Sequence, residues 1–247
     1  MKTFTIKDNV KKFLTVLFWI LIWQVVSLFT EEILFVSPFK VLPKIFENLG
    51  DLNFYQNLLS TVLKVSWGFI LGLIAALFLG GLSYRFKVFQ ELISPLILFL
   101  KSVPVVSFIM LAWLFLSPQG IPVLISFIIV VPIVYLNFYE GLSRVDKSYL
   151  NMAEVFNVGL WKKVEYIYLP SVRGYLLSAV ELSIGMAWKS GLAAEVITFP
   201  EFGLGALIYN SKLYLDTVNL FAYTIMAVVS CYILEKGVLY IIRRILK

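Results

Sequence analysis

Long apolar segments alternate with short polar ones along the whole chain. Six segments of 17 to 25 residues are almost free of charged side chains, and they cover residues 13–29, 58–82, 92–116, 121–139, 175–197 and 218–242. Because about 20 helical residues cross the hydrocarbon core of a bilayer, each segment is long enough to span a membrane, the first only just. The pattern predicts an all-α integral membrane protein with about six transmembrane helices, built as a single domain over residues 1–247.

Composition agrees with this interpretation and excludes several classes of function. Of the 247 residues, 60% are hydrophobic and 15% are charged, whereas a soluble domain carries about 25% charged residues. The chain has no histidine and a single cysteine, Cys231. It therefore lacks the commonest metal ligand and general base, and it cannot close an internal disulfide. We expect no catalytic residue, no metal site and no cofactor held by this chain.

Basic residues outside the six segments are distributed unevenly between the two sides of the predicted membrane. Fourteen of these 17 Lys and Arg side chains fall on the side that holds the N-terminus, the 83–91 loop, the loop after the fourth segment and the C-terminus. By the positive-inside rule this side is cytoplasmic, so both termini are predicted to be cytoplasmic. No small-residue cleavage site follows Phe29, and we expect the first segment to remain an uncleaved span. This topology explains the net charge of +6 without a nucleic-acid partner.

Prolines and glycines mark places where helices are expected to bend or to approach closely. Pro95 and Pro104 lie in the third segment, and Pro122 and Pro132 lie in the fourth. Each proline removes a backbone donor and tends to kink a helix, which membranes tolerate where protein or a water-filled cavity satisfies the freed carbonyls. Spans three and four are therefore candidates to line a pathway, with simple packing kinks as the alternative. The glycines expected to permit close helix packing are Gly68, Gly72, Gly80 and Gly81.

The cytoplasmic loop at residues 141–173 is too long for a tight turn and too amphipathic for a tether. Residues 148–157 predict one short helix with Asp146 or Ser148 as its N-cap, and Gly159 is expected to end it. This helix is suited to insert into a groove on a partner protein. The alternative is a helix that lies on the lipid surface. Its apolar side chains are Leu150, Ala153, Val155 and Phe156.

Charged side chains inside the predicted spans are candidates for function, because an ionisable group is costly in lipid. We expect Lys101 and Lys189 to give a translocation path a positive lining that suits an anionic substrate. The alternative is that each lysine pairs with Glu181 or Glu195 and only holds helices together. Lys64 lies near a span end and is expected to extend toward the membrane surface. The residues assigned to the path are Lys101, Ser102, Pro104, Ser107, Asn137, Trp188, Lys189 and Glu195.

The loop ends in a second predicted helix, residues 160–169, which Pro170 is expected to stop before the fifth span. Its last residues resemble a motif of the membrane subunits of binding-protein-dependent ABC importers. That motif is Glu-Ala-Ala, a few residues, Gly, nine residues, and then an aliphatic residue, any residue, Leu-Pro. Here Ile167-Tyr-Leu-Pro supplies the ending, Asn157 takes the place of the glycine, and Asn151-Met-Ala takes the place of Glu-Ala-Ala. Asparagine is the next-best residue after glycine for a positive φ.

Other motifs narrow the resemblance to one branch of this family. Residues 99–115, with a basic residue, two further residues and then Pro104 before an aliphatic run, resemble the third span of the nitrate, sulfonate and taurine branch. Residues 185–197, followed by Phe202-Gly-Leu-Gly and Asp216-Thr, resemble its fifth span and the loop that follows. The resemblance covers roughly residues 58–235.

The resemblance implies a type I importer permease with a MetI-like fold. Two permease subunits, commonly identical in this branch, would face two cytoplasmic ATPase subunits, and an extracytoplasmic binding protein would deliver the substrate. No phosphate-binding loop of the form G-x-x-x-x-G-K-[ST] occurs in the sequence, so ATP and Mg²⁺ are expected on the partner ATPase. The residues implied to form the ATPase-coupling loop are Tyr149, Leu150, Ala153, Glu154, Val155, Phe156, Asn157, Gly159, Leu169 and Pro170.

The resemblance also implies a location and a class of substrate. A member of this branch would be a multi-pass protein of the bacterial inner or plasma membrane, surrounded by the lipid bilayer. Its expected substrate is a small anion such as nitrate, an alkanesulfonate or taurine. The alternative within the same importer role is a thiamine-precursor pyrimidine or another small metabolite.

Two other classes of membrane protein remain as alternatives. An ion-coupled secondary transporter would also use six spans with broken helices and buried charges. The chain has no internal repeat, however, and that class gives no reason for a two-helix cytoplasmic loop. An intramembrane enzyme has less support, because the absence of histidine removes Ser-His dyads and His-based metalloprotease sites, and no paired Asp motif lies within the spans.

Overall fold

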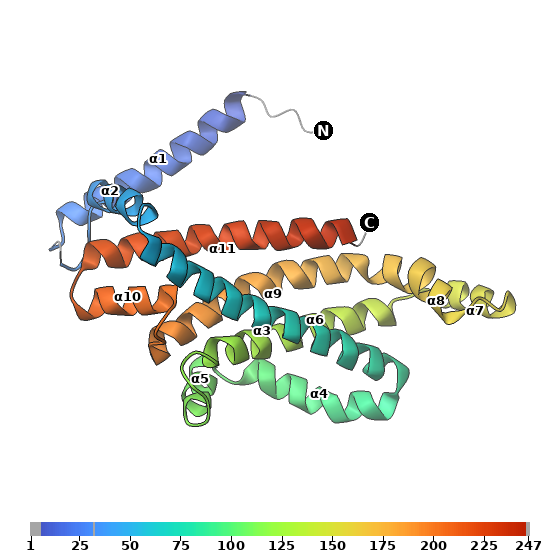
Figure 1. Cartoon of the computed structure of the whole chain (residues 1–247). Coiled ribbons are helices and arrows are strands. Elements are labelled where there is room, and N and C mark those ends of the chain that lie inside the picture. Colours follow the sequence, from blue (N-terminus) through green and yellow to red (C-terminus); the bar gives the residue numbers. More distant parts are fainter. Residues whose placement is uncertain (1–5, 32, 246–247) are drawn as a thin grey trace.

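The computed structural model describes residues 6–31 and 33–245, and every regular element in these ranges is helical (Figure 1). Twelve elements follow one another, of which η1 is a π-helical turn. They are α1 Ile6–Leu28, α2 Pro38–Leu49, α3 Leu52–Arg85, α4 Lys87–Ser102, α5 Val105–Trp113, α6 Ile121–Ser143, α7 Lys147–Val155, α8 Leu160–Lys163, η1 Val164–Tyr168, α9 Leu169–Thr198, α10 Leu204–Leu213 and α11 Thr217–Ile245.

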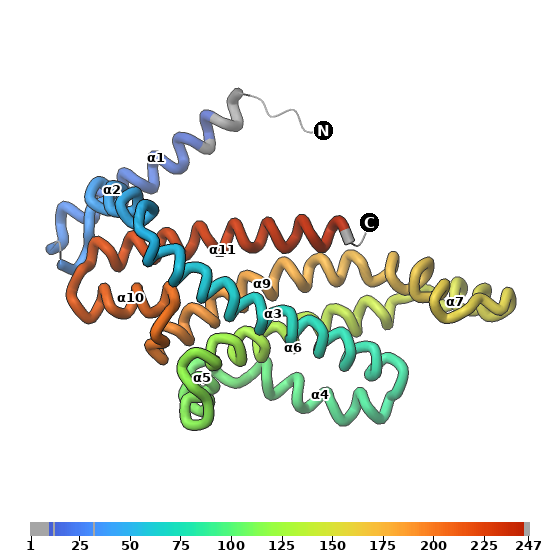
Figure 2. Tube along the Cα trace, in the orientation of Figure 1, coloured from blue at the N-terminus to red at the C-terminus, as the bar shows by residue number. Residues whose placement is uncertain are grey.

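The long helices run back and forth along one direction, and the short helices lie at the two ends (Figure 2). At one end, α7 and α8 project beyond the body, and the turn between α3 and α4 lies on the same side. At the opposite end lie α2, α5 and α10. The molecule is therefore an elongated helical bundle with two different ends.

Helix α6 lies at the centre and packs along both α3 and α9. Glycines on α3 allow the backbones to approach closely: a Cβ on Gly68 would lie 2.3 Å from the Val123 carbonyl oxygen, and one on Gly72 would lie 2.8 Å from Val130 Cβ. A Cβ on Gly80 would likewise meet α6, whereas one on Gly81 would meet nothing within 4 Å. The prediction of close packing is confirmed for the first three glycines and is wrong for Gly81, which faces open space.

Each of the six predicted spans is occupied by helix, although the helices differ in apolar character. Three of them, α3, α6 and α11, are long and apolar enough to cross a membrane, or four if α4 and α5 together count as one span. The apolar part of α1 is shorter, at Phe13–Leu28. Helix α9 fills the fifth segment but carries Glu181, Lys189 and Glu195 along its length, which lowers its mean hydropathy.

The third predicted segment, 92–116, is not one straight helix. The chain bends by 97° between α4 and α5, where Pro104 is the N-cap of α5. This is the break that the missing N–H and fixed φ of a proline favour. Pro95 and Pro132 lie inside α4 and α6. The expected kink at Pro122 is wrong, because this residue lies in the first turn of α6, where its missing donor costs no helical hydrogen bond.

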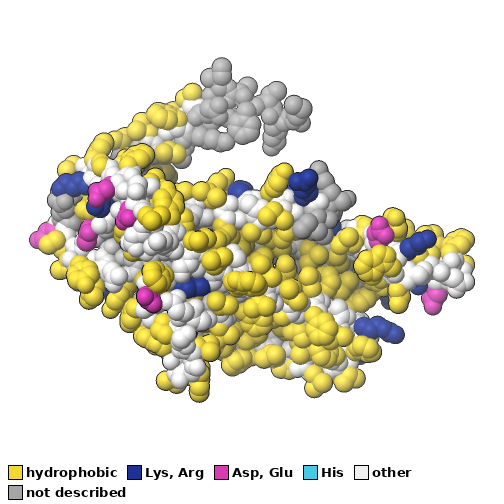
Figure 3. Space-filling view, in the orientation of Figure 1, with side chains coloured by type: hydrophobic (Ala, Val, Ile, Leu, Met, Phe, Trp, Pro, Cys, Tyr) yellow, Lys and Arg dark blue, Asp and Glu magenta, His cyan; other side chains and the backbone are white. Residues whose placement is uncertain are grey.

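Apolar side chains cover most of the face of the molecule shown in Figure 3. Large hydrophobic residues on the long helices point outward, including Phe78, Leu98 and Val228, each 65% exposed. A surface of this kind is unfavourable in water and suits a hydrocarbon solvent. The exposed faces of the long helices are therefore suited to contact lipid.

Candidate functional site

The loop between α6 and α9 begins with the helix that the sequence predicts. Helix α7 spans Lys147–Val155, and the Asp146 side chain caps it by accepting a hydrogen bond from the Ser148 backbone N–H at 2.8 Å. That hydrogen bond lowers the pKa of the Asp146 carboxyl below its usual range, because it stabilises the charged form. Of the two predicted N-caps, Asp146 is the one the structure uses.

The chain reverses direction after α7 at Asn157. This residue has φ +48°, in the left-handed region, and the Val158 N–H donates to the Ala153 carbonyl at 2.8 Å across the turn. Asn157 therefore adopts the left-handed conformation expected of the glycine in the importer motif. The expectation that Gly159 ends the helix is wrong, because Gly159 has φ −60° and serves as the N-cap of α8.

The second loop helix does not stop at Pro170. Helices α8, η1 and α9 follow one another without a break from Leu160 to Thr198, so the predicted stop is wrong. The reason lies in η1: the Leu169 N–H bonds to the Val164 carbonyl five residues back, as in a π-helical turn. Pro170 then lies in the first turn of α9, where the wider preceding turn accommodates the residue without a donor.

Side chains of α7 divide into a face that packs on the loop and a face that is exposed. Ala153 is buried, and it lines a pocket of about 590 Å³ together with Tyr149, Met152, Phe156 and Ile167. Val155 is 77% exposed and Phe156 74% exposed at the end of the helix. The remaining predicted coupling residues are exposed (Glu154, Asn157, Gly159, Pro170) or half-buried (Leu150, Leu169).

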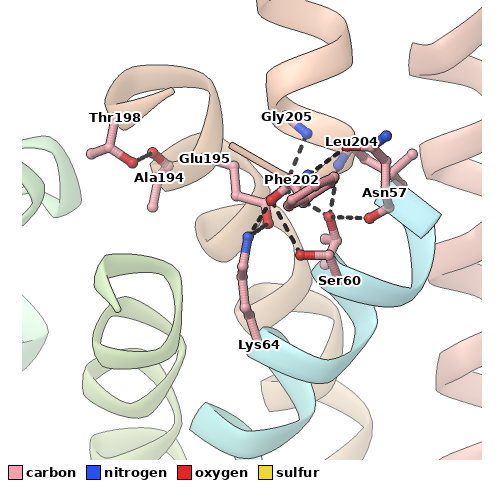
Figure 4. A network of polar contacts seen from close by, with 11 residues as sticks. Asn57, Ser60, Lys64, Ala194, Glu195, Thr198, Phe202, Leu204 and Gly205 are labelled. Atoms are coloured by element: carbon pink, nitrogen blue, oxygen red, sulfur yellow. Dashed lines mark hydrogen bonds and ion pairs between the residues drawn. The ribbon is translucent and has the colours of Figure 1, made fainter. Parts of the chain in front are cut away.

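A buried polar network lies at the other end of α9 (Figure 4). The carboxylate of Glu195 is fully buried and accepts hydrogen bonds from the Thr61 hydroxyl at 2.7 Å and the Gly205 N–H at 3.0 Å. The Lys64 ammonium lies 3.1 Å from it and also donates to the Phe202 carbonyl. One carboxylate thus joins α3, α9 and the start of α10, and all its charge is compensated by donors and a cation.

The segment Phe202-Gly-Leu-Gly is shaped to fit this carboxylate. Gly203 has φ +154°, and its N–H donates to the Asn57 side chain at 2.8 Å. A Cβ on Gly203 would lie 2.5 Å from Glu195 Oε1, and a Cβ on Gly205 would lie 2.3 Å from Glu195 Cβ. Both glycines are required because any side chain would occupy the space of the glutamate. We call Asn57, Thr61, Lys64, Glu195, Gly203 and Gly205 the glutamate clamp.

The clamp corrects two expectations. Glu195 pairs with Lys64 rather than with Lys101 or Lys189. The expectation that Lys64 extends to the membrane surface is also wrong, because its side chain is only 11% exposed and points toward Glu195. A signal was present in the sequence: Asn57, Thr61 and Lys64 recur at intervals of four and three residues, which places them on one face of α3.

The other predicted path residues lie in separate places. Lys101 lines a pocket with Tyr135 and Leu136 between α4 and α6. Lys189 lines a different pocket of about 240 Å³ with Cys231 and Glu235, between α9 and α11. The structure therefore does not bring the two lysines together within one chain. Of the other predicted path residues, Trp188 is buried and Ser107 is exposed. The Asn137 side chain donates to the Ile133 carbonyl, and the Ser102 hydroxyl donates to the Leu98 carbonyl. Pro104 is the N-cap of α5.

Comparison with known proteins decides the family. Residues 68–247 match the model of the binding-protein-dependent transport system inner membrane component. The chain belongs to this family. The match includes the loop from α7 to η1 and most of the bundle around it. As a member of the family, the chain is an ABC importer permease, a multi-pass membrane transport subunit.

Individual permeases resemble the chain over most of its length. The bicarbonate transport system permease protein CmpB of Synechococcus elongatus is 25% identical over 212 residues, which cover 79% of this chain and 74% of CmpB. The putative aliphatic sulfonates transport permease protein SsuC of Bacillus subtilis is 25% identical, covering 92% of this chain and 83% of SsuC. The nitrate import permease protein NrtB of Synechococcus elongatus is 21% identical, covering 77% and 72%. These relatives agree with the predicted nitrate and sulfonate branch.

Proposed function

We propose that this permease carries a small anion across the membrane, crosses the bilayer six times, works as a pair of identical copies and takes its energy from separate ATPase subunits. The observation that carries the proposal is the folded loop that projects from one end of the bundle, with Val155 and Phe156 exposed at the end of α7. Exposed apolar side chains on a short, capped helix suit insertion into a groove of a partner protein.

The course of the chain supports the six-span topology. In Figure 1 the segments α1, α3, α4, α6, α9 and α11 run alternately in opposite directions, so each can be one crossing. The turn between α3 and α4, the loop with α7 and the end of α11 then share one side. Most of the basic residues that lie outside the spans belong to this side, which makes it cytoplasmic by the positive-inside rule.

The test of the coupling loop is assembly with the ATPase. We expect Val155→Asp and Phe156→Asp to abolish co-purification of the ATPase subunit, because a carboxylate cannot enter an apolar groove without a large desolvation cost. Ala153→Asp is a weaker test, because Ala153 is buried within the loop itself and its substitution would unfold α7. Tyr214→Asp, at an equally exposed site at the opposite end, is the matched control. Normal ATPase binding by Val155→Asp and Phe156→Asp would overturn the proposal.

Three of the similar permeases are named for bicarbonate, sulfonate and nitrate transport, and all three solutes are anions. Lys101 and Lys189 each line a pocket between the long helices of the bundle. We expect Lys101→Met and Lys189→Met to reduce uptake while leaving ATPase assembly intact, since removing a cation removes attraction for an anion. Unchanged uptake in both variants would remove these lysines from the path.

The remaining partners follow from the same proposal. A substrate-binding protein docks at the extracytoplasmic end, where α2 and α10 lie, and ATP with Mg²⁺ binds to the ATPase subunits. Reconstitution distinguishes this importer from the alternative of an ion-coupled transporter. Uptake that requires ATPase, ATP and binding protein supports the importer, whereas uptake by the permease alone down an ion gradient would overturn it.

A further inference from the structure

A pocket with several basic side chains in its wall lies at the end of the bundle that we assign to the cytoplasm, apart from the glutamate clamp and from the two lysine pockets. Its volume is about 430 Å³, and its walls come from the end of α3, the start of α4, the end of α6 and the start of α7. Three basic side chains line it: Arg85 from α3, Lys87 from α4 and Lys147 from α7. It therefore joins the α3–α4 turn to the helix proposed to bind the ATPase.

The positive charge in this pocket has no compensating carboxylate. None of the residues that line it is acidic. Within the described part of the chain, Arg85, Lys87 and Lys147 form no ion pair; Glu140, on the neighbouring face of α6, is bound to Arg144 at 2.6 Å. The Arg85 guanidinium lies 5.6 Å from the centroid of the Phe86 ring. All three cations are exposed, so water weakens their mutual repulsion, and an anion between them would be attracted by all three.

The start of α4 adds further positive potential at the same place. Phe86 is its N-cap and provides no side-chain hydrogen bond, so the first N–H groups of the 16-residue helix have no side-chain acceptor. Helix α7, in contrast, is capped by Asp146. Lys87 occupies the first position of α4, where a cation opposes the helix dipole. An anion in the pocket would relieve this repulsion and accept hydrogen bonds from the free N–H groups.

Two neutral donors complete the lining. Gln90 contributes an amide and Tyr139 contributes a hydroxyl group. The Ser143 hydroxyl already donates to the Tyr139 carbonyl, and the Tyr84 side chain is hydrogen-bonded to Tyr168. Arginine together with neutral donors binds the oxygens of a phosphate or sulfate group, because the guanidinium contacts two oxygens at once. The pocket thus has the charge and the donors for an oxyanion.

We propose that this pocket binds a tetrahedral oxyanion, a phosphate or sulfonate group, between Arg85 and Lys147. The bound group ties the α3–α4 turn to α7 and so fixes the orientation of the coupling loop. Its source is either the headgroup of an anionic phospholipid or a free cytoplasmic anion. The inference rests on the proposed function for the cytoplasmic placement of the pocket and for the coupling role of α7, whereas binding of the anion itself does not depend on it.

Direct binding measurements test the proposal without requiring transport. The permease–ATPase complex is placed in nanodiscs of neutral lipid and titrated with radiolabelled sulfate. In a parallel arm, the complex is purified from mixed phosphatidylglycerol and phosphatidylcholine, and the retained phosphatidylglycerol is counted by native mass spectrometry. The variants are Arg85→Gln and Lys147→Gln. Arg244→Gln is the matched control, because it removes one charge from exposed helix α11 outside the pocket.

We expect Arg85→Gln and Lys147→Gln each to weaken binding about tenfold, the effect of one lost charge-assisted hydrogen bond, while Arg244→Gln binds as the unmodified complex does. Loss in the sulfate arm identifies a free anion, and loss in the lipid arm identifies a headgroup. If both variants bind both probes as Arg244→Gln does, or if neither probe binds, the proposal is overturned. ATPase retention by all variants verifies folding, and it keeps failure here distinct from failure of the importer proposal.

Discussion

The ammonium of Lys64 on α3 lies 3.1 Å from the carboxylate of Glu195 on α9, and the two side chains are only 11% and 0% exposed. The pair joins segments that are 131 residues apart in the chain. Because the carboxylate also receives hydrogen bonds from Thr61 and Gly205, the glutamate is the point at which α3, α9 and α10 meet.

Removing one member of the pair is expected to cost more than removing both charges. Lys64→Met leaves a buried carboxylate without its cation, and we expect a loss of about 3–5 kcal/mol in the free energy of unfolding. Adding Glu195→Gln removes the uncompensated charge and restores part of the loss. A double-mutant cycle on detergent-purified protein, followed by thermal unfolding, measures the coupling. Strictly additive losses would show that the two side chains do not interact.

The contact between α3 and α6 predicts opposite effects for two glycines on the same helix. Gly68→Ala places a methyl group 2.3 Å from the Val123 carbonyl oxygen, so we expect destabilisation of about 1–3 kcal/mol from overpacking. Gly81→Ala meets nothing within 4 Å and should stabilise α3 by about 0.5–1 kcal/mol, because alanine loses less entropy in a helix. Thermal unfolding of both variants measures the difference. Equal effects would contradict the close approach of the two backbones.

The left-handed turn after α7 predicts which residue types are tolerated at position 157. Asn157 has φ +48°, so Asn157→Gly should be neutral or slightly stabilising, whereas Asn157→Val should cost about 1–2 kcal/mol through its Cβ. The effect should appear as faster amide hydrogen exchange in α7 and weaker ATPase retention. A Val variant that matches the Gly variant in both measurements would show that the left-handed turn is unimportant.

The cap of α7 predicts a pH dependence of the loop. The pKa of Asp146 is lowered in the folded state by the hydrogen bond from the Ser148 N–H. The stabilisation by this carboxylate is therefore complete above the ordinary aspartate pKa and is lost as the pH falls through the lowered one. The protection of the α7 amides, measured against the intrinsic exchange rate at each pH, should therefore fall in that acidic range. Asp146→Asn should keep the cap and lose this acid-dependent fall in protection, so an unchanged profile in this variant would contradict the assignment.

The sequence predicts the helices of the bundle well, because the length of each apolar segment and the capping residues at its ends depend only on residues that are close in sequence. The helix α7 and its cap at Asp146 follow from short-range rules, whereas the left-handed residue at position 157 follows from the resemblance to the importer motif. The positions of the six apolar segments follow from hydropathy in the same way. Local information of this kind does not depend on how the helices pack.

Contacts between distant segments were harder to predict. The pairing of Lys64 with Glu195 depends on which faces of α3 and α9 meet, and hydropathy gives no information on that. The continuation of the helix through Pro170 depends on the π turn at Val164–Tyr168, which has no reliable sequence signal. The separation of Lys101 from Lys189 likewise follows from helix packing. Each of these corrections concerns an orientation rather than the existence of an element.

Helix α9 connects the two ends of the molecule. Its 30 residues give a rod about 45 Å long at 1.5 Å per residue, with the loop that we propose to bind the ATPase attached at one end and the glutamate clamp at the other. No turn interrupts it after Pro170. A tilt imposed on this loop would therefore move the far end of α9 as well, and the network around Glu195 is the part of the protein that must either resist that movement or pass it on to α10.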